Sequence, residues 1–276
     1  MTQPTTVTAG SLDVPDATLH YEVRGSGPLV VLVGAPMDAA HFAPLADLLA
    51  TDHTVLTTDP RGINRSRLTD PGQDSTPRQR ADDLSRLLTH LDAGPAAVLG
   101  SSGGAVSALA LTEAHPEQVH TVIAHEPPLL ELLDDRDQLR RQTATMIATY
   151  QAGDVLGAWA QFMAQANIEL PPGALEMMFG GDRDPQAVAD ERFWFDHEMV
   201  PTISWQPDVA VLRAVQTRVV IGVGEESGGQ ICERTSAALG ALLDVGITRF
   251  PGDHIGFVED AERFGSRLRA VLDERG

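Results

Sequence analysis

The sequence has 276 residues, 42% of them hydrophobic, which is enough to bury the core of one domain with room for an inserted subdomain. A formal net charge of −19 argues against binding nucleic acid or an anionic membrane surface. The partner that we expect is a small-molecule substrate. The single cysteine, Cys232, excludes an internal disulfide and a cysteine-built metal site.

The first ten residues are polar, and we expect them to be loosely ordered. They lack the basic and apolar regions of a secretory signal, and no run of about eighteen apolar residues occurs in the chain. A cytoplasmic protein is the resulting expectation. All 20 basic residues are arginine and alanine is abundant, which is typical of a high-GC bacterial genome such as that of an actinobacterium.

The first third of the chain alternates apolar strands with helices. Residues 29–33 are uniformly apolar, which is typical of a strand buried on both faces of a parallel sheet. Thr76 and Pro77 combine a capping residue with a first-turn proline and predict a helix start. The remaining pattern predicts strands at 19–24 and 54–58 and a helix at 41–50.

The alternation continues with a helix at 105–114 and a strand at 119–125, and it breaks in the next eighty residues. That stretch reads as helices at 136–152, 155–166, 174–180 and 187–199. Strands at 218–222 and 247–250 then enclose a helix at 230–243, and an amphipathic helix closes the chain. The pattern predicts an α/β fold with a mostly parallel, doubly wound sheet. Its core would comprise residues 1–126 and 209–276, with a helical cap at 127–208 inserted after the strand that ends near His125.

A Gly-x-Ser-x-Gly motif spans Gly100 to Gly104, with an apolar strand before it and an apolar helix after it. A serine at such a sharp strand-to-helix turn needs small neighbours, because strand and helix nearly touch there. The following helix N-terminus favours negative charge on a reacting oxygen. The motif therefore predicts Ser102 as a nucleophile, although a glycine-rich loop alone would show the same pattern.

Together these pieces resemble the serine hydrolases of the α/β-hydrolase fold over nearly the whole chain. The matching pieces, in the family's order, are the Gly34-Ala35-Pro36 loop, Asp59-Pro60-Arg61-Gly62, the Ser102 motif, the helical cap and His254. The resemblance implies covalent catalysis by a Ser-His-acid triad, without a cofactor or a metal. It also implies that Asp59 and Arg61 belong to a structural turn.

The resemblance places the general base at His254, between the last strand and the last helix. The acid is open, because the loop that usually carries an aspartate here reads Gly224-Glu225-Glu226-Ser227. Glu226 is one candidate. We favour Glu126, which directly follows the strand ending at His125 and precedes two prolines, because a rigid strand end fixes an imidazole better than a loop does. Some lipases and the haloalkane dehalogenases resemble this second arrangement.

The resemblance also implies an oxyanion hole built from the backbone N–H groups of Gly103 and Ala35. Relatives commonly have His-Gly at the start of the second loop, whereas this chain has Val33-Gly34. Asp38 and His41 either support that loop in its place or face water.

Large apolar residues of the cap are expected to dock it on the core and to line a cavity. We name Phe162, Met178 and Trp194 as substrate-binding candidates, together with Met37 from the core. The expected substrate is an ester or thioester of a small to medium, largely apolar acyl group.

Three alternatives stay open. A peptidase or amidase would hold a substrate amine with cap acids such as Glu191 or Glu198. An epoxide-opening tailoring enzyme or a non-catalytic small-molecule binder would use the same fold. The sequence leaves the oligomeric state open between monomer and homodimer.

Overall fold

The computed structural model of the chain describes residues 6–274, which are built around one nine-stranded sheet. Its strands are β1 (Val7–Val14), β2 (Ala17–Gly25), β3 (Leu29–Val33), β4 (Thr54–Thr58), β5 (Arg67–Leu68), β6 (Ala96–Ser101), β7 (Val119–His125), β8 (Arg218–Gly224) and β9 (Ile247–Phe250). The expectation of a loosely ordered start is wrong for residues 7–10, because they pair with β2. Residues 1–5 lie outside the described part of the chain.

The order across the sheet is β1-β2-β4-β3-β6-β7-β8-β9, with β5 paired to β2. Every pair from β4 to β9 is parallel, and the pairs that involve β1, β2 or β5 are antiparallel. This confirms the predicted mostly parallel sheet. In the register, Ser101 of β6 lies opposite His125 of β7, which lies opposite Gly222 of β8. Ser102 and Glu126, the residues that follow the first two, therefore leave the sheet side by side at one edge.

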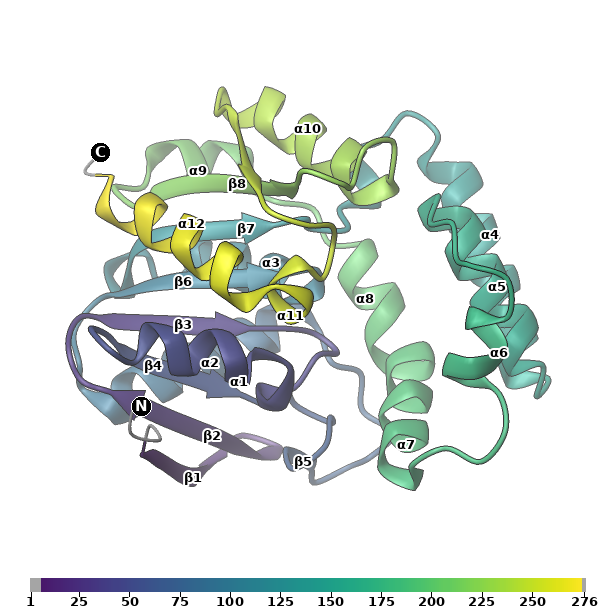
Figure 1. Cartoon of the computed structure of the whole chain (residues 1–276), viewed down its shortest axis with the longest axis horizontal. Coiled ribbons are helices and arrows are strands. Elements are labelled where there is room, and N and C mark those ends of the chain that lie inside the picture. The colour runs from purple at the N-terminus through teal and green to yellow at the C-terminus, as the bar shows by residue number, and fades with distance from the viewer. Residues whose placement is uncertain (1–5, 275–276) are drawn as a thin grey trace.

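Helices cover both faces of the sheet (Figure 1). They are α1 (Ala39–Leu49), α2 (Pro77–Leu91), α3 (Gly103–Ala114), η1 (Pro116–Gln118), α9 (Val209–Ala214), α10 (Ile231–Leu243), α11 (Gly256–Glu259) and α12 (Ala261–Asp273). Phe42 of α1 and Phe264 of α12 pack on Leu32 of β3 and cover one face. Helices α2, α3, α9 and α10 cover the other. Both faces of the parallel strands are thus buried, which explains the uniformly apolar β3.

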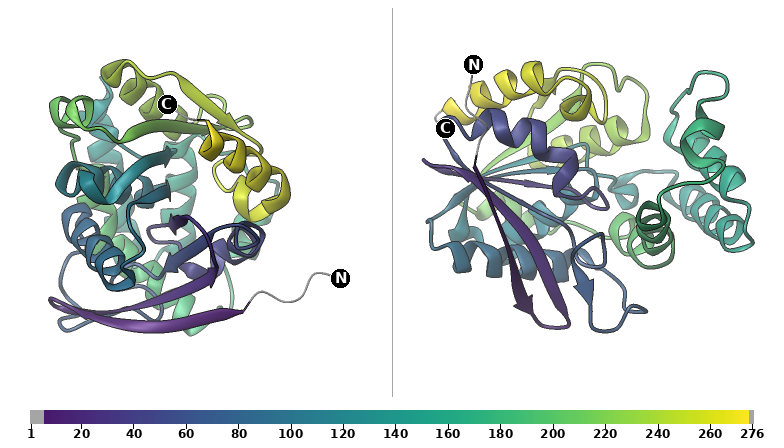
Figure 2. Two further views of the ribbon diagram at one scale, coloured as in Figure 1. Left: turned by 90° about the vertical axis from the view of Figure 1, so that its left-hand side faces the viewer. Right: turned by 60° about the horizontal axis from the view of Figure 1, so that its bottom comes forward.

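Between β7 and β8 the chain is helical, and we call residues 127–208 the helical insertion. Its elements are η2 (Leu130–Leu132), α4 (Arg136–Gln151), α5 (Val155–Ala166), α6 (Ala174–Phe179), α7 (Pro185–Phe193), the π-helix η3 (Trp194–Glu198) and α8 (Met199–Ile203). Figures 1 and 2 show α4 to α8 beyond the sheet edge at which β6 and β7 end. The single helix predicted at 187–199 is divided between α7 and the π-helix η3. Sequence periodicity missed this division, because a π-turn shifts the 3.6-residue repeat by one residue.

The helical insertion has an aromatic core of its own. The ring of Trp159 stacks on Phe179 at a centroid distance of 3.9 Å, and Tyr150 stacks on Phe195 at 4.1 Å. The insertion is also tied to the rest of the chain by polar contacts. The amide of Ser75 donates to the His197 carbonyl at 3.0 Å, and the Arg80 guanidinium donates to Thr202 Oγ1 at 2.8 Å.

Several helix starts follow from local side-chain chemistry. Thr76 caps α2 and Pro77 opens it, as predicted, and Thr76 also forms a capping box with Gln79. Asp38 accepts from the amides of Ala40 and His41 and caps α1. No helix within residues 6–274 combines the length and apolarity needed to cross a membrane.

Candidate active site

Ser102 occupies a strained turn between β6 and α3, with φ 56° and ψ −126°. A non-glycine residue adopts such dihedral angles only where its surroundings impose them. Here the surroundings pack closely because the neighbouring residues are glycines. A Cβ on Gly100 would lie 2.3 Å from the Gly104 carbonyl oxygen, and one on Gly104 would lie 2.2 Å from the Val33 carbonyl oxygen. The two outer glycines of the motif thus allow strand, turn and helix to meet at van der Waals distance.

The loop after β3 packs directly against this turn. A Cβ on Gly103 would lie 2.5 Å from the carbonyl oxygen of Ala35, so the backbones of these two residues are in contact. Within residues 6–274 neither the Gly103 nor the Ala35 N–H donates a hydrogen bond to the protein. Two adjacent backbone donors are therefore free to bind an oxygen atom that carries negative charge.

His254 contacts one carboxylate, that of Glu126. The distance from His254 Nδ1 to Glu126 Oε2 is 2.6 Å, and Glu126 Oε1 accepts a 2.8 Å hydrogen bond from the Gly224 amide. Glu126 is fully buried, and its backbone has a positive φ of 52°. Glu226, the alternative acid, has an exposed side chain, and its amide donates to the Gly252 carbonyl.

The electrostatics of this pair follow from burial and contact. Burial alone would raise the pKa of Glu126, but the hydrogen bond and the charge of His254 lower it to about 2. Burial alone would lower the pKa of His254, but Cys232 and Glu126 beside it raise that pKa well above its ordinary value. The pair is thus built to favour an imidazolium next to a carboxylate.

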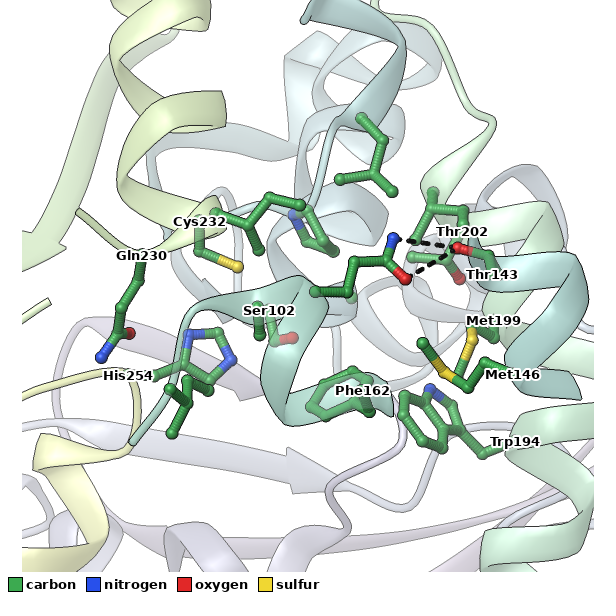
Figure 3. Close-up of a pocket in the computed structure, with 18 of the residues that line it drawn as sticks. Ser102, Thr143, Met146, Phe162, Trp194, Met199, Thr202, Gln230, Cys232 and His254 are labelled. Carbon is green, nitrogen blue, oxygen red and sulfur yellow. Dashed lines mark hydrogen bonds between the residues drawn. The ribbon is translucent and has the colours of Figure 1, made fainter. Parts of the chain in front are cut away.

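Ser102, Gly103, Ala35 and His254 line one cavity of about 110 Å³ (Figure 3). No hydrogen bond joins the side chains of Ser102 and His254 among the described residues, and such bonds are often long before a substrate binds. The other lining residues are mostly apolar: Pro128, Leu130, Thr143, Met146, Phe162, Gln165, Ala166, Ile168, Trp194, Met199, Thr202, Ile203, Gln230, Ile231 and Cys232.

Of the four residues predicted to bind substrate, two line the cavity and two do not. Phe162 and Trp194 line the cavity. Met37 instead packs against the core under α1, and Met178 on α6 is 50% exposed; neither lines the cavity. Composition alone could not separate these cases, because the direction of a side chain depends on how the helical insertion packs.

The structure also places the polar residues around the Ala35 loop. Asp59 is buried, accepts from the Ala39 amide at 3.0 Å and binds Arg65, while Arg61 forms a buried bidentate pair with Asp83. Asp38 contacts His41 Nδ1 at 2.7 Å as well as capping α1. Asp38 and Asp59 thus act at the start of α1, Arg61 ties the turn after β4 to Asp83 of α2, and none of these residues lines the cavity.

Sequence reasoning missed the polar part of the cavity wall, namely Thr143, Gln165, Thr202, Gln230 and Cys232. Thr143 and Thr202 carried one usable signal, since each is a polar residue within a helical face that is otherwise apolar.

One group of three candidate metal ligands occurs within residues 6–274, and it lies at this site. It consists of Glu126, Cys232 and His254, whose ligand atoms lie within 4.8 Å of one another. A metal ion there would have to replace the proton shared across the 2.6 Å contact between Glu126 and His254. We therefore treat the group as an acid–base arrangement.

The parallel sheet, the Ser102 turn and the histidine–carboxylate pair at the strand ends define a hydrolase of the α/β type. Residues 27–166 match the family model described as alpha/beta hydrolase fold, and the chain belongs to that family.

Two curated relatives and one solved structure illustrate the similarity. The chain is 33% identical to the uncharacterized hydrolase YraK of Bacillus subtilis, over 98% of this chain and 97% of the relative. It is 31% identical to a zearalenone hydrolase of Cladophialophora bantiana over 50% of this chain and 58% of that one. A thermophilic esterase from Thermogutta terrifontis superposes with a TM-score of 0.73 at 17% identity, covering 96% of this chain and 98% of the esterase.

Proposed function

We propose that this hydrolase is a serine esterase that works through an acyl-enzyme, with Ser102 as nucleophile, His254 as base and Glu126 as the acid that orients the base. The 2.6 Å contact between Glu126 and His254, in the cavity that Ser102 lines, carries this proposal. A carboxylate at Nδ1 fixes the ring so that Nε2 is left to take the serine proton.

The reaction proceeds in two halves. Ser102 Oγ attacks the ester carbonyl carbon while His254 takes its proton, and the tetrahedral oxyanion is bound by the Gly103 and Ala35 amides. The C–O bond to the leaving alcohol then breaks, and His254 returns its proton to that oxygen. In the second half His254 deprotonates a water molecule that attacks the acyl carbon. The bond from that carbon to Ser102 Oγ then breaks, His254 returns the proton to Oγ, and the carboxylic acid product leaves.

The helical insertion acts as a cap that sets selectivity. The insertion supplies most of the residues that line the cavity, and most of these are apolar, which suits a small to medium, largely apolar acyl group bound as an ester or thioester. The acids of the insertion do not line the cavity. Glu191 binds Arg183 and Trp159, Glu198 is buried, and neither lines the cavity, so no insertion acid is placed to hold a peptide amine.

Esters of nitrophenol with acyl groups from acetyl to decanoyl test this function, together with matched thioesters and aminoacyl anilides. The wild-type enzyme should hydrolyse the esters with a maximum at short to medium length, and Ser102→Ala should lower kcat by about ten-thousandfold or more. Ester turnover that survives in Ser102→Ala, or anilides cleaved faster than esters, would contradict the proposal. Ser101→Ala is the matched control on the neighbouring residue.

A further inference from the structure

The wall of the cavity away from His254 carries three polar side chains of the helical insertion. They are Thr143 of α4, Gln165 of α5 and Thr202 of α8. Figure 3 shows Thr143 and Thr202 on the same side as Met146, Met199 and Trp194, across Ser102 and Phe162 from His254 and Cys232. Thr143 and Thr202 are only 3% and 4% exposed. Polar groups so deeply buried in an apolar wall need hydrogen-bond partners.

Thr143 and Gln165 satisfy each other only in part. Gln165 Nε2 donates to Thr143 Oγ1 at 3.0 Å and to the Leu139 carbonyl at 3.4 Å, which uses both amide hydrogens. The Thr143 hydroxyl donates to Gln165 Oε1 at 3.3 Å, which uses its hydrogen. After these bonds, the only hydrogen-bonding capacity left on the pair is that of lone pairs on Gln165 Oε1 and Thr143 Oγ1. This pair can therefore only accept a further hydrogen bond.

Thr202 presents the opposite polarity. Its Oγ1 accepts a 2.8 Å hydrogen bond from the guanidinium of Arg80, a buried side chain whose other hydrogen-bond partners are Ser107 and Ser75. Because a guanidinium only donates, the hydroxyl hydrogen of Thr202 stays available, and within residues 6–274 no protein acceptor takes it. The positive charge behind the oxygen also makes that hydrogen a stronger donor.

We propose that these three side chains bind a hydroxyl group of the substrate. The natural substrate class would then be an ester whose acyl part is apolar next to the scissile carbonyl and carries a hydroxyl at its far end. This inference rests on the proposed esterase function, because it takes Ser102 as the point from which the acyl chain extends.

A hydroxyl is the group that matches both polarities, since it accepts from Thr202 and donates to Gln165 or Thr143. A ketone or ether would accept from Thr202 and leave the acceptor pair without a donor. An ammonium group would be repelled by the positive charge of Arg80, and a carboxylate would be repelled by the lone pairs of Gln165. Mismatched or unpaired groups of this kind weaken binding strongly in a buried site, so the site should select a hydroxyl group over them.

Matched pairs of nitrophenyl esters test the inference. Each pair has the same linear acyl chain, ending in a methyl group in one member and in a hydroxymethyl group in the other, and chain length is varied. The measured quantity is the ratio of kcat/KM for the hydroxylated member over the plain one. At the chain length that spans the cavity, the wild-type ratio should reach about ten.

Substitutions of Thr202 and Gln165 show whether these side chains produce this kcat/KM ratio. Thr202→Val and Gln165→Leu should each bring it to about one or below, while Thr202→Ser, which keeps the donor, should retain it. Thr145→Val is the matched control, because Thr145 lies on the exposed side of the same helix as Thr143. A wild-type ratio below one at every chain length, or equal ratios in Thr202→Val and Thr145→Val, would overturn the inference.

Binding to Ser102→Ala separates this inference from the esterase proposal. Calorimetry with the same ester pairs measures affinity in a variant that lacks the proposed nucleophile. Tighter binding of the hydroxylated member that Thr202→Val abolishes supports the polar site even if the wild-type enzyme hydrolyses no ester. Equal affinities for the two members contradict the polar site even if ester turnover is fast.

Discussion

His254 Nδ1 and Glu126 Oε2 lie 2.6 Å apart although 128 residues separate them in the chain. The contact forms because Glu126 follows β7 directly and the loop that carries His254 follows β9, with β8 between them. The amide of Gly224, the last residue of β8, binds the second carboxylate oxygen at 2.8 Å. One strand end therefore fixes the acid, and the acid in turn fixes the orientation of the imidazole.

Glu126→Gln tests this relationship. The amide keeps the size of the side chain but removes the charge that stabilises the imidazolium, so kcat should fall by about a thousandfold. Glu226→Gln, on an exposed side chain, should change kcat by less than about twofold. Steady-state kinetics on one nitrophenyl ester, with a melting curve for each variant, gives the comparison. A larger loss in Glu226→Gln would move the acid to the later loop.

The pH profile of kcat/KM reports the same pair. With His254 as the proposed base, activity needs its neutral ring and should rise with pH through the pKa of His254, which lies well above the ordinary value. Glu126 stays ionised across this range because its pKa is about 2. In Glu126→Gln the carboxylate no longer raises the pKa of His254, while burial of the ring still lowers it and Cys232 still raises it, so the rise should move to lower pH. An unchanged midpoint in that variant would contradict the pairing.

Much of the fold follows from local sequence patterns. The apolar run of β3, the capping box at Thr76 and the glycines around Ser102 each reflect a contact within a few residues or one sheet pairing. The favoured position of Glu126 follows from the same reasoning, since a residue that directly follows a strand has a fixed place at the sheet edge.

The cavity wall was less predictable. Met178 is half exposed whereas Phe162 lines the cavity, although both are apolar residues of predicted helices. The difference depends on how α5 and α6 pack on each other, which no local pattern encodes. Thr202 illustrates the same limit, because its role depends on Arg80, which lies 122 residues away.

The close packing at the Ser102 turn predicts a sharp contrast between two glycines. Gly100→Ala would place a Cβ 2.3 Å from the Gly104 carbonyl oxygen, so it should destabilise the protein by about 3 kcal/mol or more and abolish activity. At Gly228 an added Cβ meets nothing within 4 Å, and Gly228→Ala should be nearly neutral. Denaturant unfolding measures both. Equal stabilities would show that the turn tolerates a methyl group.

Glu198 predicts a pH dependence of stability. Its buried carboxyl group has no hydrogen-bond partner among the described residues, and burial raises its pKa to about 7 from an ordinary 4.5. The folded state thus keeps a proton that the unfolded chain releases, so stability should fall as pH rises from about 4.5 to about 7. The loss should reach about 3 kcal/mol.

The matching variant is Glu198→Gln, which stays neutral at every pH. Its free energy of unfolding relative to wild type should increase between pH 5 and pH 8 and level off above that. Asp196→Asn, on the same π-helix but partly exposed, should show no such gain. A difference between Glu198→Gln and wild type that is constant with pH would mean that the carboxyl group is ionised inside the fold.

Ser102 is the proposed nucleophile, and covalent labelling tests this role most directly. After reaction with a fluorophosphonate, intact mass spectrometry of the wild-type enzyme should show one added phosphonyl group, and peptide mapping should place it on Ser102. Labelling should persist in Ser101→Ala and Cys232→Ala and disappear in Ser102→Ala. A phosphonyl group that Ser102→Ala still acquires at the wild-type rate would contradict the account.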